Sequence, residues 1–297
     1  MKRPPRLAAG RARALGLPTR GTTAPNRLRR VDRWITGTLA LPTDPLVVDL
    51  GYGSAPVTCV ELYSRLRSAW PGARVVGLEI DPDRVAGAQP SADPPGLVFR
   101  RGGFELAGLR PSLVRAMNVL RQYDEAPSRE AWATMLARLA PGGLLVEGTC
   151  DELGRIGAWV LLDASGPRSL TFAVHLATLD RPSTLAERLP KALIHHNVPG
   201  HPIHGLLTAF DAAWDAAAVL APFGPRQRWI GAVSGLASAG WPVLGDRRRW
   251  RLGEVSFGWS ELFGSELLAD QDRLVHQLDA EPRQHPVADL PGEREQR

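Results

Sequence analysis

Apolar and polar positions follow two alternating patterns in the first half of the chain. Short, almost wholly apolar runs occur at 46–50, 74–80, 96–100, 112–120 and 144–149. Such runs are typical of strands that are buried on both faces of a parallel sheet. Between them, apolar residues recur at helical spacing in 55–69 and 128–140, and a brief helix is expected at 82–89. Because right-handed crossovers place helices on both faces, the pattern predicts an α/β fold with a doubly wound, mostly parallel sheet.

The pattern changes after residue 155. Two apolar stretches around a turn at 165–168 predict an antiparallel hairpin over 158–176. An amphipathic helix is expected at 204–221, and one more strand within 248–262. The remaining residues are charged and rich in proline, which predicts a flexible tail over 264–297.

The positive charge is concentrated at the N-terminus. Residues 1–33 contain ten basic side chains against the single acid Asp32, whereas the whole chain of 297 residues has a net charge of only +5. The body is therefore mildly acidic, and we predict a disordered basic tail over 1–20. Asn26 is expected to cap a helix that begins at Arg27, with arginines on the face opposite its apolar residues. Whether these arginines contact a ligand stays open.

Composition narrows the class of protein further. The two cysteines, Cys59 and Cys150, match no zinc or redox spacing, so a reduced, cytoplasmic protein is the simplest interpretation. No run of 18 or more apolar residues occurs, and we therefore predict no membrane span. Arginine outnumbers lysine by 34 to two in a chain rich in Ala, Gly and Pro, which favours a GC-rich, bacterial genome.

The stretch VVDLGYGSAP (47–56) places a glycine turn between the first strand and the first helix. Glycine allows a positive φ and a close approach of ligand to backbone, and a helix N-terminus attracts an anionic group. Glu79 ends the second strand, where a carboxylate can accept hydrogen bonds from both hydroxyls of a ribose. The two features together indicate a ribose-bearing cofactor.

Further details of the sequence distinguish between such cofactors. The G-x-G-x-x-G pattern of nicotinamide-binding proteins would need a glycine at Pro56 and usually has an apolar residue where Asp49 stands. VVDLGYGSAP, RVVGLEIDPDRV (74–85) and LARLAPGGLLVEG (136–148), in this order, resemble the motifs of class I S-adenosylmethionine-dependent methyltransferases. The resemblance covers about 45–150, half of the chain.

This resemblance implies a Rossmann-like methyltransferase sheet of seven strands, one of them antiparallel near the C-terminal end, and S-adenosyl-L-methionine as the methyl donor. It also implies a set of cofactor-binding residues. These are Asp49, Gly51, Tyr52 and Gly53 at the methionine end, Glu79 and Ile80 at the ribose, Gly103 and Phe104 beside the adenine, and Asn118 and Val119 closing the pocket.

The sequence departs from the family pattern at several points. The third glycine of the loop is Ala55, and the acid expected after the third strand is Glu105, two residues late. NVLRQYDE (118–125) is not the N-P-P-Y motif of nitrogen-directed DNA and protein methylation, so that class of acceptor loses support. The hairpin follows the fifth strand after a short link, which leaves the order of the last strands open.

Three residues are candidates for catalysis on the acceptor. Tyr123 and Asp151 follow the fourth and fifth strands, although a capped turn explains Asp151 equally well. His195 belongs to the histidine-rich stretch 191–205 and could be a general base in a lid, whereas a surface or core histidine is the plainer alternative. Prolines divide these histidines and no cysteine is near, so we predict no metal site.

We predict one methyltransferase domain over 21–263, with a cofactor-binding half at 45–150 and hairpin, helices and lid or acceptor elements at 151–263. The expected function is methyl transfer to a small molecule or lipid-like metabolite, because the body is mildly acidic and no RNA-binding module is evident. The alternative is an RNA methyltransferase that grips its substrate with the arginine-rich N-terminal arm, residues 1–33. A second alternative is a protein of this fold that binds the cofactor or a partner without catalysis. A third is an NAD-linked oxidoreductase, which Pro56 and Asp49 disfavour. The oligomeric state is left open.

Overall fold

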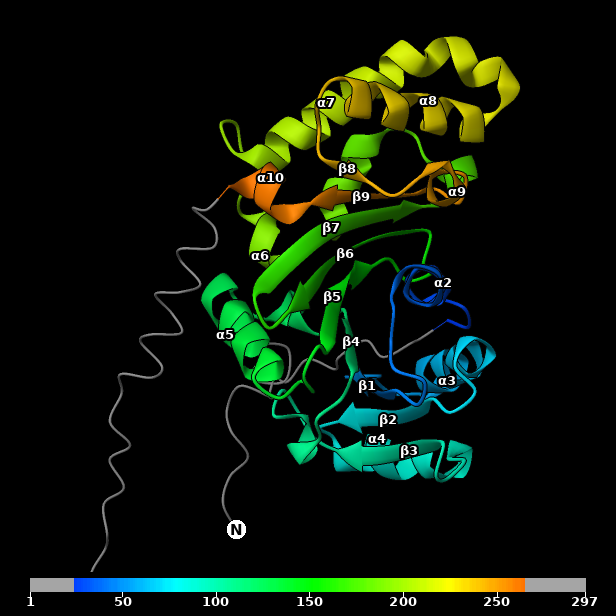
Figure 1. The fold of residues 1–297 in the computed structure, drawn as a ribbon, viewed down its shortest axis with the longest axis vertical. Helices are drawn as coiled ribbons and strands as arrows, with labels where there is room; N and C mark the ends of the chain where they lie inside the picture. Colours follow the sequence, from blue (N-terminus) through cyan, green and yellow to red (C-terminus); the bar gives the residue numbers. More distant parts are fainter. Residues whose placement is uncertain (1–23, 265–297) are drawn as a thin grey trace, which may run out of the picture.

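The computed structural model describes residues 24–264, which form one nine-stranded mixed sheet with helices on both faces (Figure 1). The strand order is β3-β2-β1-β4-β5-β6-β7-β9-β8. The first five strands in this order are parallel, and each later strand is antiparallel to its neighbour. The predicted doubly wound α/β class is confirmed. The tails predicted over 1–20 and 264–297 lie outside the described residues, apart from Gly264.

The first half of the chain confirms the predicted alternation of strands and helices. Its strands are β1 (Leu46–Leu50), β2 (Arg74–Glu79), β3 (Leu97–Arg101), β4 (Leu113–Met117) and β5 (Leu144–Cys150). The crossovers contain α3 (Val57–Ala69), α4 (Pro82–Ala88) and α5 (Glu125–Leu136). Because the strand order reverses between β1 and β4, the carboxyl ends of these two strands border the switch point at which such folds bind ligands.

The second half departs from the seven strands that the resemblance implies. The predicted hairpin is β6 (Ile156–Asp163) and β7 (Gly166–Val174), and β6 pairs directly with β5. The one strand expected within 248–262 is confirmed, although it covers only part of that range. Asp246 caps a short helix there, and the segment divides into α9 (Arg247–Trp250), β9 (Glu254–Gly258) and α10 (Trp259–Phe263). With β8 (Val243–Leu244), the described residues hold nine strands.

Two sets of helices cover the sheet. α2 (Arg29–Thr38), α3 and α4 pack on one face, where Ile35 and Leu62 are fully buried. α5, α6 (Lys191–Ile194), α7 (Pro202–Ala216) and α8 (Pro225–Ser238) contribute to the core on the other face, which includes Phe210 and Trp229. Figure 1 shows α7 and α8 side by side beyond β9, at the end of the molecule away from β3.

One helical segment of the described residues, Pro202–Phe223, is long and apolar enough to cross a membrane by length and composition. Its side chains Ile203, Leu206 and Phe210 are buried in the core beside the sheet. A core helix of a folded domain passes the same test of length and composition. The expected absence of a membrane span therefore stays a prediction.

Three predicted element ends are wrong. Asn26 has a left-handed φ of 62° and does not cap α2, and its side-chain oxygen instead accepts a hydrogen bond from Arg65 at 2.7 Å. The helix expected from residue 128 begins earlier, at Glu125, and the hydroxyl of Ser128 inside it donates to the Asp124 carbonyl at 2.8 Å. β4 ends before Asn118, whose φ of 63° cannot continue a strand.

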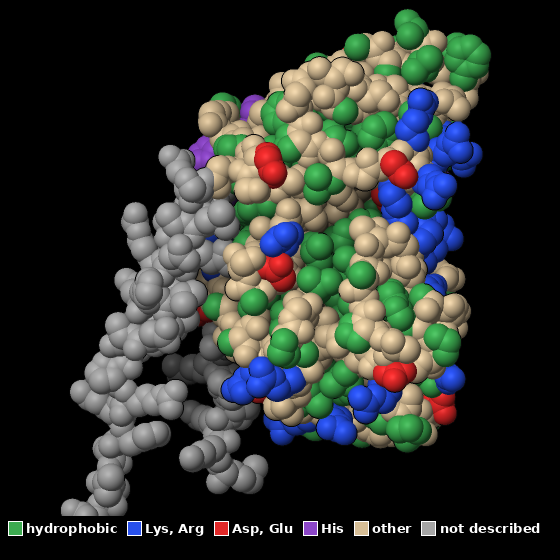
Figure 2. Space-filling model, in the orientation of Figure 1, with side chains coloured by type: hydrophobic (Ala, Val, Ile, Leu, Met, Phe, Trp, Pro, Cys, Tyr) green, Lys and Arg blue, Asp and Glu red, His purple; other side chains and the backbone are tan. Residues whose placement is uncertain are grey.

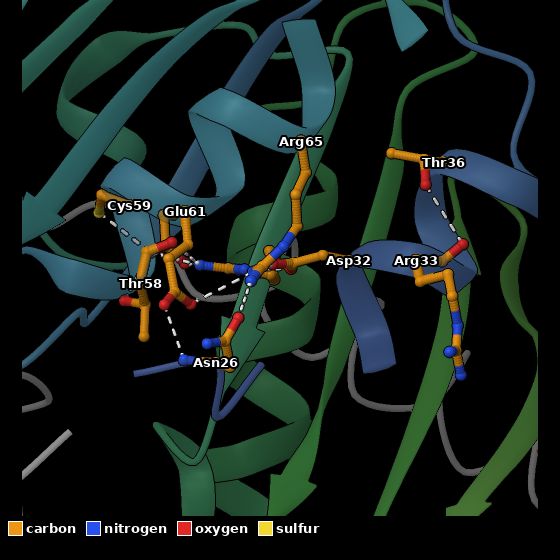
Figure 3. A network of polar contacts seen from close by, with 10 residues as sticks. Asn26, Asp32, Arg33, Thr36, Thr58, Cys59, Glu61 and Arg65 are labelled. Carbon is orange, nitrogen blue, oxygen red and sulfur yellow. Dashed lines mark hydrogen bonds and ion pairs between the residues drawn. The ribbon is translucent and has the colours of Figure 1, made fainter. Parts of the chain in front are cut away.

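Arg115 on β4 joins four elements through a buried network of ion pairs. Its guanidinium lies 2.7 Å from Asp49 on β1, pairs with Asp32 on α2, and donates to the Thr58 carbonyl on α3 at 3.0 Å. Arg65 on α3 approaches the same Asp32 at 2.5 Å, as part of the network that Figure 3 shows. Burial acts to lower the pKa of Arg115, but Asp32 and Asp49 raise it above its ordinary value, so the guanidinium stays charged.

Replacement of Arg115 by leucine is expected to lower the free energy of unfolding by about 3–5 kcal/mol, because it leaves the buried Asp49 without its cation and the buried Asp32 with Arg65 alone. The matched control is Arg168→Leu, since Arg168 pairs with Asp163 while 59% exposed and should cost no more than about 1 kcal/mol. Urea unfolding measures both. Equal losses in the two variants would contradict the role given to the buried network.

Glu147 on β5 is a buried acid that has no cationic partner within residues 24–264. Trp132 donates to its Oε2 at 3.3 Å, and its Oε1 has no hydrogen-bond partner among the described residues. Burial raises the pKa of Glu147 from 4.5 to about 8, so the side chain is protonated in the folded protein at neutral pH. The unfolded chain ionises first and binds fewer protons, so this group makes stability fall as the pH rises from 4.5 to about 8.

The substitution Glu147→Gln is therefore expected to flatten the pH dependence of the free energy of unfolding over this range and to raise that free energy at its upper end. The slope that disappears is at most roughly 1.4 kcal/mol per pH unit. Denaturant unfolding at several pH values measures it, with the exposed Glu187→Gln as control. An unchanged slope in Glu147→Gln would show that Glu147 ionises normally in the fold.

Candidate functional site

The glycine turn after β1 lies against the end of β4, at the switch point of the sheet. Gly51 and Gly53 have left-handed φ values of 69° and 85°, which side chains disfavour. A Cβ on Gly51 would lie 2.8 Å from Cγ2 of Val119, so the backbone of the turn approaches this residue closely. Gly51 and Val119, which the resemblance assigns to one pocket, are therefore neighbours.

Glu79, at the end of β2, holds the glycine turn from the side. Its Oε2 accepts a hydrogen bond from the Gly53 amide at 3.1 Å, and its Oε1 accepts from the amides of Ile80 and Asp81 at 2.9 and 3.3 Å. The Arg84 guanidinium lies 3.7 Å from the same carboxylate. The carboxylate is 6% exposed and fixed in orientation, and its oxygens keep further lone pairs for a hydroxyl donor.

Asp49 and Tyr52 are engaged within the protein rather than at the rim of the turn. Asp49 accepts hydrogen bonds from Arg115, from the Thr58 hydroxyl at 3.2 Å and from the Cys59 thiol at 3.0 Å. The Tyr52 ring packs edge-on against Phe99 at 5.4 Å between centroids, and burial raises the pKa of Tyr52 above its ordinary value. Both side chains therefore brace the strand and turn from within.

The loop after β3 brings further predicted residues to the same edge. Glu105 turns back so that its Oε1 accepts a hydrogen bond from the Gly103 amide at 2.8 Å, and a Cβ on Gly103 would lie 3.7 Å from Ile80. The ring of Phe104 contacts that of Tyr123 edge-on, at 5.6 Å between centroids. The ends of β2, β3 and β4 thus form one continuous rim around the turn.

Asn118 links the ends of β4 and β5. Its Oδ1 accepts a hydrogen bond from the Cys150 amide at 3.0 Å, and its amide group donates to the Cys150 sulfur at 3.3 Å. The left-handed backbone of Asn118 turns the chain out of the strand, and asparagine tolerates this conformation better than other side chains do. Asn118 is therefore a structural corner as well as a predicted pocket residue.

The three candidate catalytic residues are in different surroundings. Tyr123 is half-buried on the rim, and burial raises its pKa above the ordinary value. Asp151 accepts hydrogen bonds from the amides of Arg155 and Ile156 at 2.6 and 3.1 Å, which is the capped turn named as an alternative. His195 is exposed, and its side chain makes no hydrogen bond or ion pair with the described residues.

His196 was not among the candidates, although it makes the contact that His195 lacks. Its Nε2 lies 2.8 Å from Oε1 of Glu125, at the start of α5. Burial acts to raise the pKa of Glu125, but His196 and Arg129 together lower it below the ordinary value. The sequence shows that two histidines are adjacent at 195 and 196. Which of the two rings faces α5 depends on where α6 ends, and the sequence does not show this.

Within residues 24–264, no group of three or more His, Cys, Asp or Glu side chains is arranged to hold a metal ion. This is a statement about the described part of the chain, and the absence of a metal stays a prediction. The groups available to a cofactor at the rim of the glycine turn are of a different kind. They are backbone amides, glycines and one oriented carboxylate, which fit a ribose and its attached groups rather than a cation.

Fold and rim together define a doubly wound α/β protein with a glycine turn at its switch point and a fixed carboxylate beside that turn. No protein-family model and no curated protein matches the sequence.

Solved structures similar to the chain include three methyltransferases. Human N-acetylserotonin methyltransferase in complex with SAM is 23% identical, with a TM-score of 0.33 over 42% of this chain and 35% of that chain. Magnesium protoporphyrin IX methyltransferase of Synechocystis with bound SAM is 20% identical, with a TM-score of 0.34 over 42% of this chain and 58% of that chain. A SAH-bound methyltransferase of calicheamicin biosynthesis is 16% identical, with a TM-score of 0.33 over 41% and 35%.

The matched part of this chain spans between 35% and 58% of the length of those three proteins. With TM-scores of 0.33 and 0.34, these similarities carry no information about the site of this chain. What the three enzymes bind is a property of those enzymes.

Gly51→Ala is expected to lower the free energy of unfolding by about 1–3 kcal/mol, because the new Cβ strains a left-handed backbone and meets Val119. The matched control is Gly87→Ala in α4, where a Cβ would meet nothing within 4 Å. That control should stabilise the protein by about 0.5–1 kcal/mol. Thermal and urea unfolding compare the two, and equal effects would contradict the close packing of the turn.

Proposed function

We propose that this protein binds S-adenosyl-L-methionine at the carboxyl edge of β1, β2, β3 and β4 and transfers its methyl group to an acceptor. The observation that carries the proposal is the Glu79 carboxylate, which three backbone amides fix beside the glycine turn. A fixed carboxylate at the end of the second strand is the arrangement with which doubly wound folds bind a ribose.

In this proposal Glu79 accepts hydrogen bonds from the ribose hydroxyls, while Gly51 and Val119 shape the wall beside the sugar and the methionine chain. Ile80, Gly103 and Phe104 lie along the rim where the adenine would rest, and Asn118 closes the far side. When bound, the cofactor supplies an electrophilic methyl group on a sulfonium, so the protein's task is alignment and exclusion of water.

Asp49 and Tyr52 receive a positioning role in place of the direct contact first expected. Asp49 is already bonded to Arg115, Thr58 and Cys59, and Tyr52 packs on Phe99. Both therefore act on the cofactor through the backbone of the turn between them.

A small molecule is the acceptor that we favour over RNA. The RNA alternative relies on arginines of the N-terminal arm, and those within the described residues mostly bind the protein itself. Arg30 donates to the carbonyls of Gly154 and Leu252, and Arg33 pairs with Glu254 at 2.6 Å. These guanidiniums are committed to holding α2 in place, which leaves fewer of them for phosphates.

For proton transfer from the acceptor, His196 is a better candidate than His195, because Glu125 can orient its ring. Tyr123 and Asp151 keep their proposed place on the acceptor side of the rim. A cytoplasmic location stays a prediction.

Calorimetric titration with S-adenosylhomocysteine and with NAD tests the proposed function. The first should bind and the second should not. Glu79→Ala should weaken the binding of S-adenosylhomocysteine by about tenfold or more, because hydrogen bonds to a charged acceptor contribute about 1.5–3 kcal/mol. The exposed Glu187→Ala is the matched control and should bind as the wild type does. Binding of NAD alone, or full affinity in Glu79→Ala, would contradict the proposal.

A further inference from the structure

The turn between α7 and α8 is apolar and exposed to solvent. Residues 216–225, AAAVLAPFGP, include no polar side chain, and Val219 and Phe223 are 78% and 74% exposed. Only 28% of the apolar stretch within Pro202–Phe223 is buried in the protein. We call residues 216–225 the apolar tip. A single exposed apolar side chain is ordinary, whereas a continuous exposed segment of them marks a surface that contacts another molecule.

The apolar tip is held by contacts at its base, where α7 and α8 pack against each other. The Cζ of Arg228 on α8 lies 4.1 Å from the centroid of the Trp214 ring on α7, and the Arg228 Nε donates to the Trp214 carbonyl at 3.1 Å. Gly224, with a φ of 95°, ends the turn, and its amide donates to the Ala221 carbonyl at 2.9 Å. The tip is therefore presented in a fixed place by two packed helices.

Exposed arginines lie beside the apolar tip. The exposed Arg226 directly follows the tip at the start of α8, and α9 packs against α8. α9 contributes two further exposed arginines and a third follows it; they are Arg247, Arg248 and Arg251. Figure 1 shows α9 beneath the start of α8, and Figure 2 shows Lys and Arg side chains gathered along the same edge of the molecule, below hydrophobic side chains at its upper end. We call these four residues the arginine stripe.

The charge of the arginine stripe is only partly offset by acids. None of its four guanidiniums forms an ion pair or a hydrogen bond within residues 24–264. Asp246 uses its carboxylate to cap α9, at 2.9 Å from the Arg248 amide, and Asp215 at the base of the tip lies 3.8 Å from Arg228. The stripe therefore leaves positive charge on the surface of a body that is otherwise mildly acidic.

An apolar tip next to a basic stripe matches the surface of an anionic lipid bilayer. Apolar side chains can enter the boundary between the headgroups and the acyl chains, which removes them from water. Arginines at the same depth as the headgroups bind lipid phosphates, and each strengthens the binding by about fivefold. Both features of this edge are therefore used by one partner.

A second copy of the chain fits this surface less well. A stable protein interface buries about 800 Å² on each partner, and the two large exposed side chains of the tip, Val219 and Phe223, provide only a small part of that area. Self-association through this edge would also bring two arginine stripes together. RNA would pair with the arginines but would leave the aliphatic part of the tip in water.

We propose that the apolar tip and the arginine stripe dock this protein on the surface of an anionic lipid bilayer. Val219 and Phe223 enter the headgroup boundary, and the stripe lies against the lipid phosphates. The contact is shallow, because Ile203, Leu206 and Phe210 of α7 stay in the core beside the sheet. This docking goes beyond the proposed methyl transfer and does not depend on it.

Co-sedimentation of the full-length protein with lipid vesicles tests the proposal. Phosphatidylcholine vesicles with about 30% phosphatidylglycerol should bind the protein, and binding should weaken as the ionic strength rises from about 0.1 to about 0.5 M. Phe223→Asp, which removes apolar burial, should lower the partition coefficient by about tenfold or more. The double variant Arg247→Gln with Arg251→Gln, which removes two charges, should lower it by a similar factor of about ten or more.

The matched control for the tip is Val198→Asp, which changes an exposed apolar residue in the turn before α7. The matched control for the stripe is Arg74→Gln with Arg100→Gln, two exposed arginines at the opposite edge of the sheet. Both controls should bind vesicles as the wild type does. Because the substituted side chains are exposed, all variants should keep the fold, which thermal unfolding checks.

Absence of wild-type binding to the anionic vesicles would overturn the proposal. Binding that persists unchanged in the tip and stripe variants would overturn it as well, and would assign the attraction to another part of the chain, such as the basic residues 1–33. Without vesicle binding, tight binding of a single-stranded RNA that depends on the stripe would assign it to nucleic acid, and a dimer that Phe223→Asp abolishes in ultracentrifugation would assign the tip to a second copy. The affinity for S-adenosylhomocysteine, measured without vesicles, should be equal in all variants, so failure of the proposed function is distinguishable.

Discussion

The rest of the structure depends on the charge of Arg115, buried between β1, β4, α2 and α3. A guanidinium in this position must keep both of its carboxylates, because an unpaired buried charge costs several kcal/mol. The pairing with Asp49 holds β1 in register beside β4, and the pairing with Asp32 attaches α2 to the same face. The two strands that border the switch point are thus fixed relative to each other by charge as well as by the sheet.

The candidate site is a consequence of this arrangement. Asp49 stands two residues before Gly51, so the network beneath the strand also fixes where the glycine turn begins. Glu79 then binds the turn from the side through the Gly53 amide. These contacts fix the turn and the carboxylate within the protein itself, which is the preorganisation that the proposed alignment of a methyl donor with an acceptor would require.

Local signals in the sequence were enough for the parallel half of the fold and for the residues along its rim. Apolar runs fix the strands, and glycines with an acid at the strand ends mark the site. Long-range contacts could not be predicted from such local signals. Arg115 lies 66 residues from Asp49 in the sequence, and no pattern in either segment indicates that the two side chains pair. For that reason Asp49 was expected to contact the cofactor, whereas its carboxylate is bonded to Arg115 within the protein. The order of the last strands and the choice between His195 and His196 likewise depend on packing between distant segments, which no periodicity encodes.

The central claim is that a ribose-bearing cofactor binds at the carboxyl edge around Gly51 and Glu79. Hydrogen exchange of backbone amides, followed with and without S-adenosylhomocysteine, tests it most directly. The account predicts slower exchange in 51–57, 79–82 and 102–106, with the hairpin of β6 and β7 unchanged. Protection that is absent from these segments, or confined to the hairpin and α7–α8, would contradict it.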